Sequence, residues 1–150
     1  MDKAAIARQN FEEGYNCCQS IVLAFAPEMG LTKDTAALLS AGLGGGVSRL
    51  REICGAVSGM AMVLGMLHGS ADPLDQAKKT ALYTEVQELA CAFSGQCGSY
   101  ICRDLLGLPP GKDDPAPSER TAQYYHSRQC GDFIAKMAEL LEKHLEERDG

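Results

Sequence analysis

The stretch Arg51–Gly65, REICGAVSGMAMVLG, places a cysteine before small residues and a long apolar run. The apolar run covers about 15 residues, whereas a membrane-spanning helix needs roughly 18 or more. We therefore expect a buried core helix over Glu52–His68 and no insertion into a membrane. The small residues between Gly55 and Gly59 make one face of this helix nearly flat, so that either a neighbouring helix or an inorganic cluster can approach it closely.

Helical periodicity extends over the rest of the chain, without hairpin signals or sustained alternation of apolar and polar residues. The three glycines in GLGGGVSRL, residues 42–50, cost too much backbone entropy for a helix interior and predict a turn or helix break. The Pro-rich segment Gly107–Glu119 predicts an exposed loop that is too short to separate domains.

Helices are expected over Lys3–Glu13, from Asn16 to about Pro27–Gly30, from Thr32 or Asp34 to about Leu43, from Asp72-Pro73 to Ser94-Gly95, over Ser99–Leu106 and over Ser127–Glu147. Asn16 is a good N-cap, and Gln19 three residues later resembles a capping box. Together the elements predict an all-α fold, a compact single-domain bundle of about six helices over residues 1–150.

The charge of the chain argues against nucleic acid as a partner. The formal net charge is -6, and binding to phosphates needs clustered lysine and arginine. The N-terminal residues carry early charges and lack the apolar segment of a secretory signal. A cytoplasmic location is therefore expected.

Seven cysteines stand out in a chain of this length: Cys17, Cys18, Cys54, Cys91, Cys97, Cys102 and Cys130. Structural disulfides are rare in a reducing cytoplasm, so the cysteines favour metal binding, a cluster or redox chemistry. An odd number also means that not all of them can pair with one another.

Four of the cysteines fall at expected helix starts: Cys17, Cys54, Cys102 and Cys130. The start of a helix offers free N–H groups and a partial positive charge, and both stabilise the thiolate that binds metals or attacks disulfides. The competing interpretation is that each of them is an ordinary core residue, because cysteine is among the most buried residue types.

The spacing of the cysteines matches no common metal motif. No C-x2-C pair is present, which argues against a zinc ribbon, thioredoxin-like chemistry and covalent c-type haem. Any metal site must therefore be assembled by the fold. His126 lies four residues before Cys130 and is a candidate additional ligand, whereas His68 and His144 are expected at the surface, near helix ends.

Four segments, in order, resemble the C_GCAxxG_C_C family of small cysteine proteins regarded as redox-active. They are GYNCCQSIVLAF, GLGGGVSRLREICGAVSGMAMVLG, GSYICRDLLG and RQCGDFIAKMAELLEKHL. The family name writes Gly-Cys-Ala, whereas this chain reads Cys54-Gly55-Ala56, which we take as the same motif. A similar domain is joined to a haem-bearing part in split-Soret cytochromes, where an iron–sulfur centre has been suspected; this chain lacks the haem part.

The resemblance implies that the four signature cysteines fall on Cys17, Cys54, Cys102 and Cys130, as the cofactor-binding and metal-binding residues. It implies a redox role without a known reaction, and Cys18, Cys91 and Cys97 are additional to the signature. No residue pattern assigns a general acid, general base or other catalytic residue.

Three functions remain open from the sequence. The first is electron transfer by an iron–sulfur cluster or metal ion bound to the four cysteines, with a redox partner protein. The second is dithiol/disulfide chemistry, with Cys54 as the attacking thiolate. The third is a structural zinc protein without redox activity. A homodimer formed through the last helix is a further expectation, although a single core stripe explains its apolar residues equally well.

Overall fold

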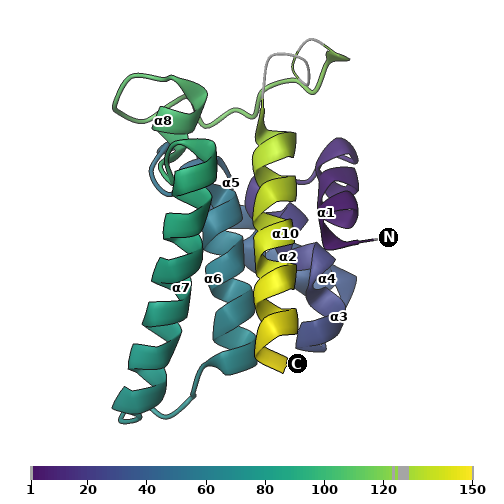
Figure 1. Ribbon diagram of the computed structural model, residues 1–150. Helices are drawn as coiled ribbons and strands as arrows, with labels where there is room; N and C mark the ends of the chain where they lie inside the picture. Colours follow the sequence, from purple (N-terminus) through teal and green to yellow (C-terminus); the bar gives the residue numbers. More distant parts are fainter. Residues whose placement is uncertain (1, 123, 125–128, 150) are drawn as a thin grey trace.

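A computed structural model describes residues 2–122, 124 and 129–149 of the chain. It is all-α, as predicted (Figure 1). The six longer helices are α1 (Lys3–Glu12), α2 (Cys17–Ala24), α4 (Lys33–Ser40), α6 (Gly55–His68), α7 (Gln76–Cys97) and α10 (Cys130–Asp149). The short elements are α3 (Ala26–Met29), η1 (Ala41–Leu43), α5 (Gly44–Val47) and α8 (Cys102–Leu106). Within the described residues, β-pairing is limited to an isolated antiparallel bridge between Ile53 and Ile101.

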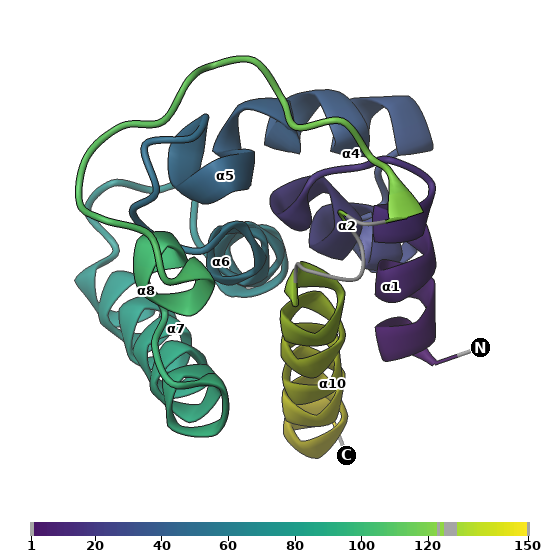
Figure 2. The same ribbon diagram turned by 90° about the horizontal axis from the view of Figure 1, so that it is seen from above.

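The long helices α6, α7 and α10 run side by side, and α1 lies beside α10 (Figure 1). α2 packs against both α1 and α6 and so lies inside the bundle. Seen from above, the starts of α6, α8 and α10 lie at one end of the bundle, and the segment that follows α8 arches over α5 towards α1 (Figure 2). The candidate site lies at this upper end.

Several helix boundaries differ from the predicted ones, among them the start of α8, which lies at Cys102 rather than Ser99. α6 begins at Gly55 rather than Glu52, because Arg51 has a φ of +62° and the Ile53 bridge holds the following residues extended. α7 begins at Gln76 rather than Pro73, because the Asp75 side chain accepts a hydrogen bond from a later amide and caps the helix there. α7 also continues past the predicted end to Cys97.

The contact between α2 and α6 explains the small residues of the opening stretch. A Cβ atom added at Gly59 would lie 2.9 Å from the Cβ of Ile21 and 3.1 Å from the carbonyl oxygen of Cys18. A Cβ atom added at Gly55 would lie 2.8 Å from the Cβ of Cys17. Both glycines therefore face α2, and the tight helix packing foreseen as one alternative is present.

Substituting Gly59→Ala is expected to lower the free energy of unfolding by about 1–3 kcal/mol, because the new methyl group overpacks the contact with α2. Gly65→Ala is the matched control on the same helix, where an added Cβ meets nothing within 4 Å. This control should be neutral or stabilise by up to about 1 kcal/mol through helix propensity. Urea unfolding of both variants checks the difference, and equal effects would contradict the packing explanation.

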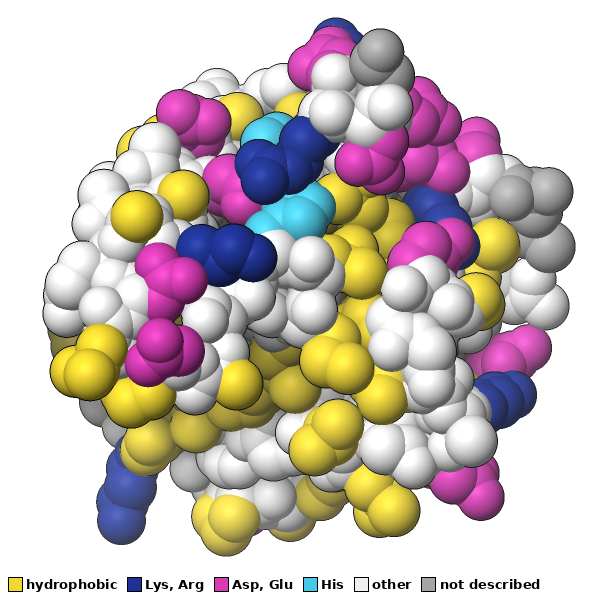
Figure 3. All heavy atoms as spheres, turned by 90° about the horizontal axis from the view of Figure 1, so that it is seen from below, with side chains coloured by type: hydrophobic (Ala, Val, Ile, Leu, Met, Phe, Trp, Pro, Cys, Tyr) yellow, Lys and Arg dark blue, Asp and Glu magenta, His cyan; other side chains and the backbone are white. Residues whose placement is uncertain are grey.

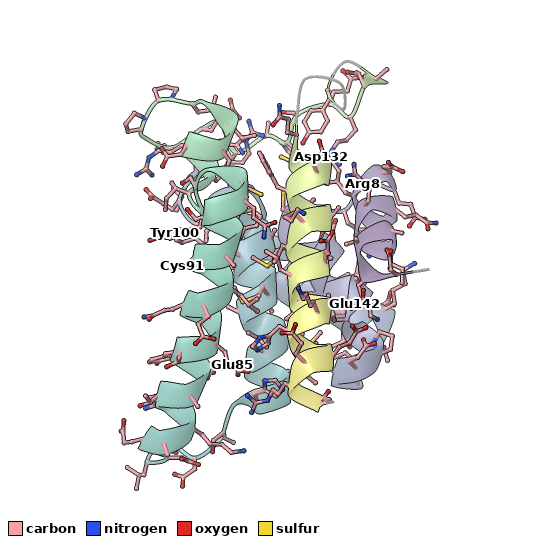
Figure 4. All side chains as sticks on the ribbon, in the orientation of Figure 1. Arg8, Glu85, Cys91, Tyr100, Asp132 and Glu142 are labelled. Carbon is pink, nitrogen blue, oxygen red and sulfur yellow. The ribbon has the colours of Figure 1, made fainter. Side chains whose placement is uncertain are left out.

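A buried glutamate joins the three long helices at the lower end. Glu85 of α7 is 6% exposed and lies 3.0 Å from His68 of α6 and 2.9 Å from both His144 and Arg148 of α10. Figure 3 shows histidine side chains beside Lys or Arg side chains at this end, and Figure 4 shows Glu85 on α7. His68 and His144, expected at the surface near helix ends, are partly buried: 13% and 22% of their side chains are exposed, and both contact this carboxylate.

Burial acts to raise the pKa of Glu85, but hydrogen bonds from His144 and His68 outweigh it, and the pKa is lowered. The carboxylate therefore stabilises the fold at pH values above the ordinary glutamate pKa of about 4.3, and this contribution is lost as the pH falls through the lowered pKa. Glu85→Gln should lose about 2 kcal/mol at pH 7.

Glu88→Gln, at an exposed position of the same helix, is the control and should change little. Chemical unfolding from pH 7 to pH 3 should show the difference between wild type and Glu85→Gln shrinking below about pH 4. A difference that stays constant over this range would contradict the ionic role of Glu85.

Candidate functional site

The start of α2 carries Cys17 and is fixed by its cap. The Asn16 side chain accepts a hydrogen bond from the Gln19 amide at 2.9 Å, and the Gln19 side chain accepts one from the Asn16 amide at 3.1 Å. This confirms the predicted capping box. Asn16 also donates to the carbonyl of Ala41 at 3.0 Å, so the cap ties this end of α2 to η1.

Cys54 and Cys102 are brought together by the isolated bridge, which lies between their two segments. Cys54 is the N-cap residue of α6, and its amide donates to the carbonyl of Tyr100 at 2.9 Å. Cys102 is the first residue of α8, and its amide donates to the carbonyl of Glu52. These reciprocal bonds place the starts of α6 and α8 side by side.

The glycine-rich segment before α6 is the predicted break and has an unusual backbone. Gly45, Gly46, residues 47–49 and Arg51 all have positive φ angles. A Cβ atom added at Gly46 would lie 2.8 Å from the Cβ of Cys102 and 2.7 Å from the amide nitrogen of Glu52. Glycine at this position therefore lets the segment pack directly against the start of α8.

The start of α10 carries Cys130, and its thiol is hydrogen-bonded to the Cys17 thiol. Arg8 of α1 forms a 2.7 Å ion pair with Asp132 in the first turn of α10, and Figure 4 shows these two residues near the upper end of the bundle. α10 is thus held against α1 at the turn that presents Cys130. His126, the candidate additional ligand, lies outside the described residues, as does Ser127, the expected start of this helix.

All four signature cysteines line one cavity of about 430 Å³. Each comes from the start of a different helix, as the sequence predicts. Other lining residues include the aromatic side chains Phe11, Tyr124 and Phe133 and the arginines Arg49, Arg51 and Arg120. The structure therefore brings together the residues that the sequence singled out, in a partly apolar and partly cationic space.

The remaining three cysteines lie elsewhere. Cys18 is buried in the core with its sulfur 3.7 Å from that of Met62. Cys91 is exposed on α7, apart from the upper end of the bundle (Figure 4). Cys97 packs against the core at the end of α7 and does not line the cavity.

The positions of the four thiols around the cavity can be compared with the ligand positions around a single metal ion. Four sulfurs around one zinc ion at about 2.3 Å would lie within roughly 3.8 Å of one another. Over the ranges that the structure describes, no three side chains of His, Cys, Asp or Glu converge closely enough to hold a metal ion. Among the described residues, the four thiols therefore share one cavity without forming a ready site for a single ion.

The surroundings raise the pKa of two of the cavity thiols. Burial raises the pKa of Cys54 to about 12, although hydrogen bonds from the amides of Ala56 and Val57 act to lower it. The hydrogen bond with Cys130, together with burial, raises the pKa of Cys17 well above its ordinary value. The expectation that helix starts favour the thiolate is therefore wrong for both residues in the metal-free protein: at Cys54 the amides do not offset the loss of water, and at Cys17 the hydrogen bond with Cys130 is the largest cause of the raised pKa.

Arg51 lines the cavity and is a further functional candidate. Its Nη1 atom donates to the Cys102 sulfur at 3.7 Å, and its Nη2 atom lies 3.1 Å from the Asp113 carboxylate. The same carboxylate oxygen lies 3.2 Å from Arg49. No local sequence signal indicated Asp113, because its two partners are more than 60 residues away.

The Pro-rich segment is exposed, as predicted, and it also covers the cavity. Pro115, Pro117 and Ser118 contribute to the cavity lining. Arg49 ties the segment down by donating to the carbonyl of Asp114 and to the Ser118 hydroxyl. The cavity is therefore closed on one side by a segment held through arginine.

The helical bundle thus brings a thiol from each of four helix starts to one cavity. Over residues 15–144 the chain matches the model of the family described as "Putative redox-active protein (C_GCAxxG_C_C)", and it belongs to that family. A search of curated proteins found no match. A search of solved structures found none either. Among the described helices, none is long and apolar enough to cross a membrane.

The buried thiol of Cys54 should react slowly in the metal-free protein. With a pKa of about 12, only about one molecule in 10⁴ carries the Cys54 thiolate at pH 8. Alkylation with iodoacetamide, followed by peptide mass spectrometry, should therefore modify Cys54 at least about 100-fold more slowly than the exposed Cys91. Similar rates at the two cysteines would contradict the burial of this thiol.

Proposed function

We propose that this protein transfers electrons through one iron–sulfur cluster held by Cys17, Cys54, Cys102 and Cys130. The observation that carries the proposal is the meeting of four thiols, each from a different helix start, around one cavity. Four cysteine thiolates are the usual ligand set of such clusters. The redox-active description of the family is consistent with this function.

The shape of the site favours a cluster over a single zinc ion. The four thiols lie around a 430 Å³ cavity and, in the described part of the chain, do not converge on one point. In a cluster the sulfur ligands belong to different iron atoms, so they are spread more widely than around one ion. The donor set and the space both fit the larger group.

The acidity of the site also suits metal binding. Burial raises the pKa of Cys54 to about 12, so a positive centre in the cavity is needed to hold this residue as a thiolate. The amides of Ala56 and Val57 are already hydrogen-bonded to it and would stabilise the negative sulfur. By contrast, a thiol of such low acidity is a poor attacking nucleophile at neutral pH.

A bound cluster supplies reversible uptake of one electron from a one-electron donor and its release to a one-electron acceptor, without bond changes in a substrate. The residues of this chain would hold the thiolate ligands at fixed helix starts. The aromatic side chains of Phe11 and Phe133 would limit water in the cavity. The proposal also includes a redox partner protein and a location in the reducing cytoplasm.

Dithiol/disulfide chemistry is the second candidate, and the hydrogen bond between the Cys17 and Cys130 thiols favours it. In this function the pair would be oxidised to a disulfide as a partner disulfide is reduced to two thiols, with transfer of two electrons. The predicted attacking residue, Cys54, does not take part in this pair.

The test is chemical analysis and a visible spectrum of protein purified without oxygen. Wild type should contain iron and acid-labile sulfide in stoichiometric amounts, with a visible absorbance that is lost in air or with a chelator. Each single Cys→Ser substitution at positions 17, 54, 102 and 130 should abolish or reduce this absorbance. Cys91→Ser is the control, since Cys91 is exposed and lies outside the cavity.

Other outcomes select other functions. Zinc without sulfide would assign a structural or regulatory zinc site. A metal-free protein that forms a Cys17–Cys130 disulfide with a measurable two-electron potential would assign dithiol chemistry. Full metal content in all four cavity variants would contradict the ligand assignment.

A further inference from the structure

We propose that the positive charge of Arg51, which lies beside this site, raises the reduction potential of the bound cluster. The inference rests on the proposed function and names a residue outside the cysteine ligands. It is carried by the position of the Arg51 guanidinium, which lines the cavity and donates to the Cys102 sulfur at 3.7 Å.

Arg51 is buried to a degree that is rare for arginine. The residue is only 6% exposed. Its Nε atom is buried and has no hydrogen-bond partner among the described residues. A buried charged donor without a partner is costly, and such a group in a native structure points to an acceptor that the protein chain does not supply. The anionic sulfur of a cluster in the adjoining cavity is such an acceptor.

The backbone holds this side chain in place at some cost. Arg51 has a φ of +62°, in the left-handed region that L-residues rarely adopt. Its amide donates to the carbonyl of Gly45 at 3.2 Å, and its carbonyl accepts from the amide of Arg103 at 3.2 Å. Backbone strain of this kind persists only where the surroundings enforce it, and it gathers at functional sites. The strained segment places a cation beside a ligand sulfur.

Asp113 moderates this charge. Its carboxylate oxygen lies 3.1 Å from Nη2 of Arg51 and 3.2 Å from Nη2 of Arg49. The guanidinium of Arg51 is thus shared between an anionic side chain on the covering segment and the thiol of Cys102. Neutralising Asp113 should leave more of the positive field of Arg51 acting on the cavity.

The sign of the effect follows from the electron balance. Reduction adds one electron, supplied by a one-electron donor, and makes the cluster and its four thiolates more negative by one charge. A nearby cation stabilises the more negative, reduced form to a greater extent, so it raises the reduction potential. Hydrogen bonds to the sulfurs act in the same direction.

The experiment measures the potential of the loaded protein by spectroscopic redox titration in wild type, Arg51→Met, Arg49→Met and Asp113→Asn. Arg51→Met should lower the equilibrium constant for reduction at least about tenfold, which is about 59 mV for one electron. Asp113→Asn should shift the potential in the opposite direction. Arg49→Met is the matched control, because it removes the same charge and the same Asp113 contact, whereas the hydrogen bonds of the Arg49 side chain in the described part of the chain go to Asp114 and Ser118.

Iron and sulfide content, measured first, separates two kinds of failure. Wild type without a cluster would overturn the proposed function and this inference with it. A loaded wild type whose potential is unchanged in Arg51→Met, or shifts as much in Arg49→Met, would overturn the role of Arg51 alone. If the Arg51→Met variant does not retain the cluster, the reduction potential of the Asp113→Asn variant is the test. A potential in Asp113→Asn that is equal to or lower than that of wild type overturns the inference.

Discussion

The close contact between α2 and α6 is the constraint on which the site depends. Gly55 and Gly59 remove the side chains that would hold the two helices apart, so the backbone of α6 lies directly against Cys17 and its neighbours. This contact fixes the start of α2 beside the start of α6, where Cys54 is the N-cap residue. The other cavity-forming elements then pack around this pair. The small residues that follow Cys54 therefore allow the close packing of α2 against α6, and the position of the cavity follows from this packing.

The site combines buried thiols with positive groups. These groups alone do not lower the pKa of the thiols enough to form thiolates. Burial raises the pKa of Cys54 despite the amides of α6, so solvent exclusion outweighs the helix start in the metal-free protein. A metal centre reverses that balance, because its charge favours the thiolate. Arg51 adds a cation to the same cavity without acting as a ligand. This combination is consistent with the proposed metal centre, which is negative overall together with its thiolate ligands, more than with a thiol that attacks a substrate.

Much of this arrangement could be predicted from sequence because its signals are local. The capping box at Asn16, the helical periodicity and the positions of the cysteines near helix starts all depend on neighbouring residues. The start of α6 could not be predicted, because it is set by the bridge between Ile53 and Ile101. The contacts of Glu85 and of Arg51 were missed for the same reason, since each joins segments distant in the sequence.

The central claim is that four cysteines from four helices hold one polynuclear centre. X-ray absorption at the iron edge of anaerobically purified protein tests it most directly. The account predicts a first shell of sulfur alone, together with scattering from a second iron atom nearby. A first shell with nitrogen or oxygen ligands, or a single metal ion without a neighbouring metal, would contradict it.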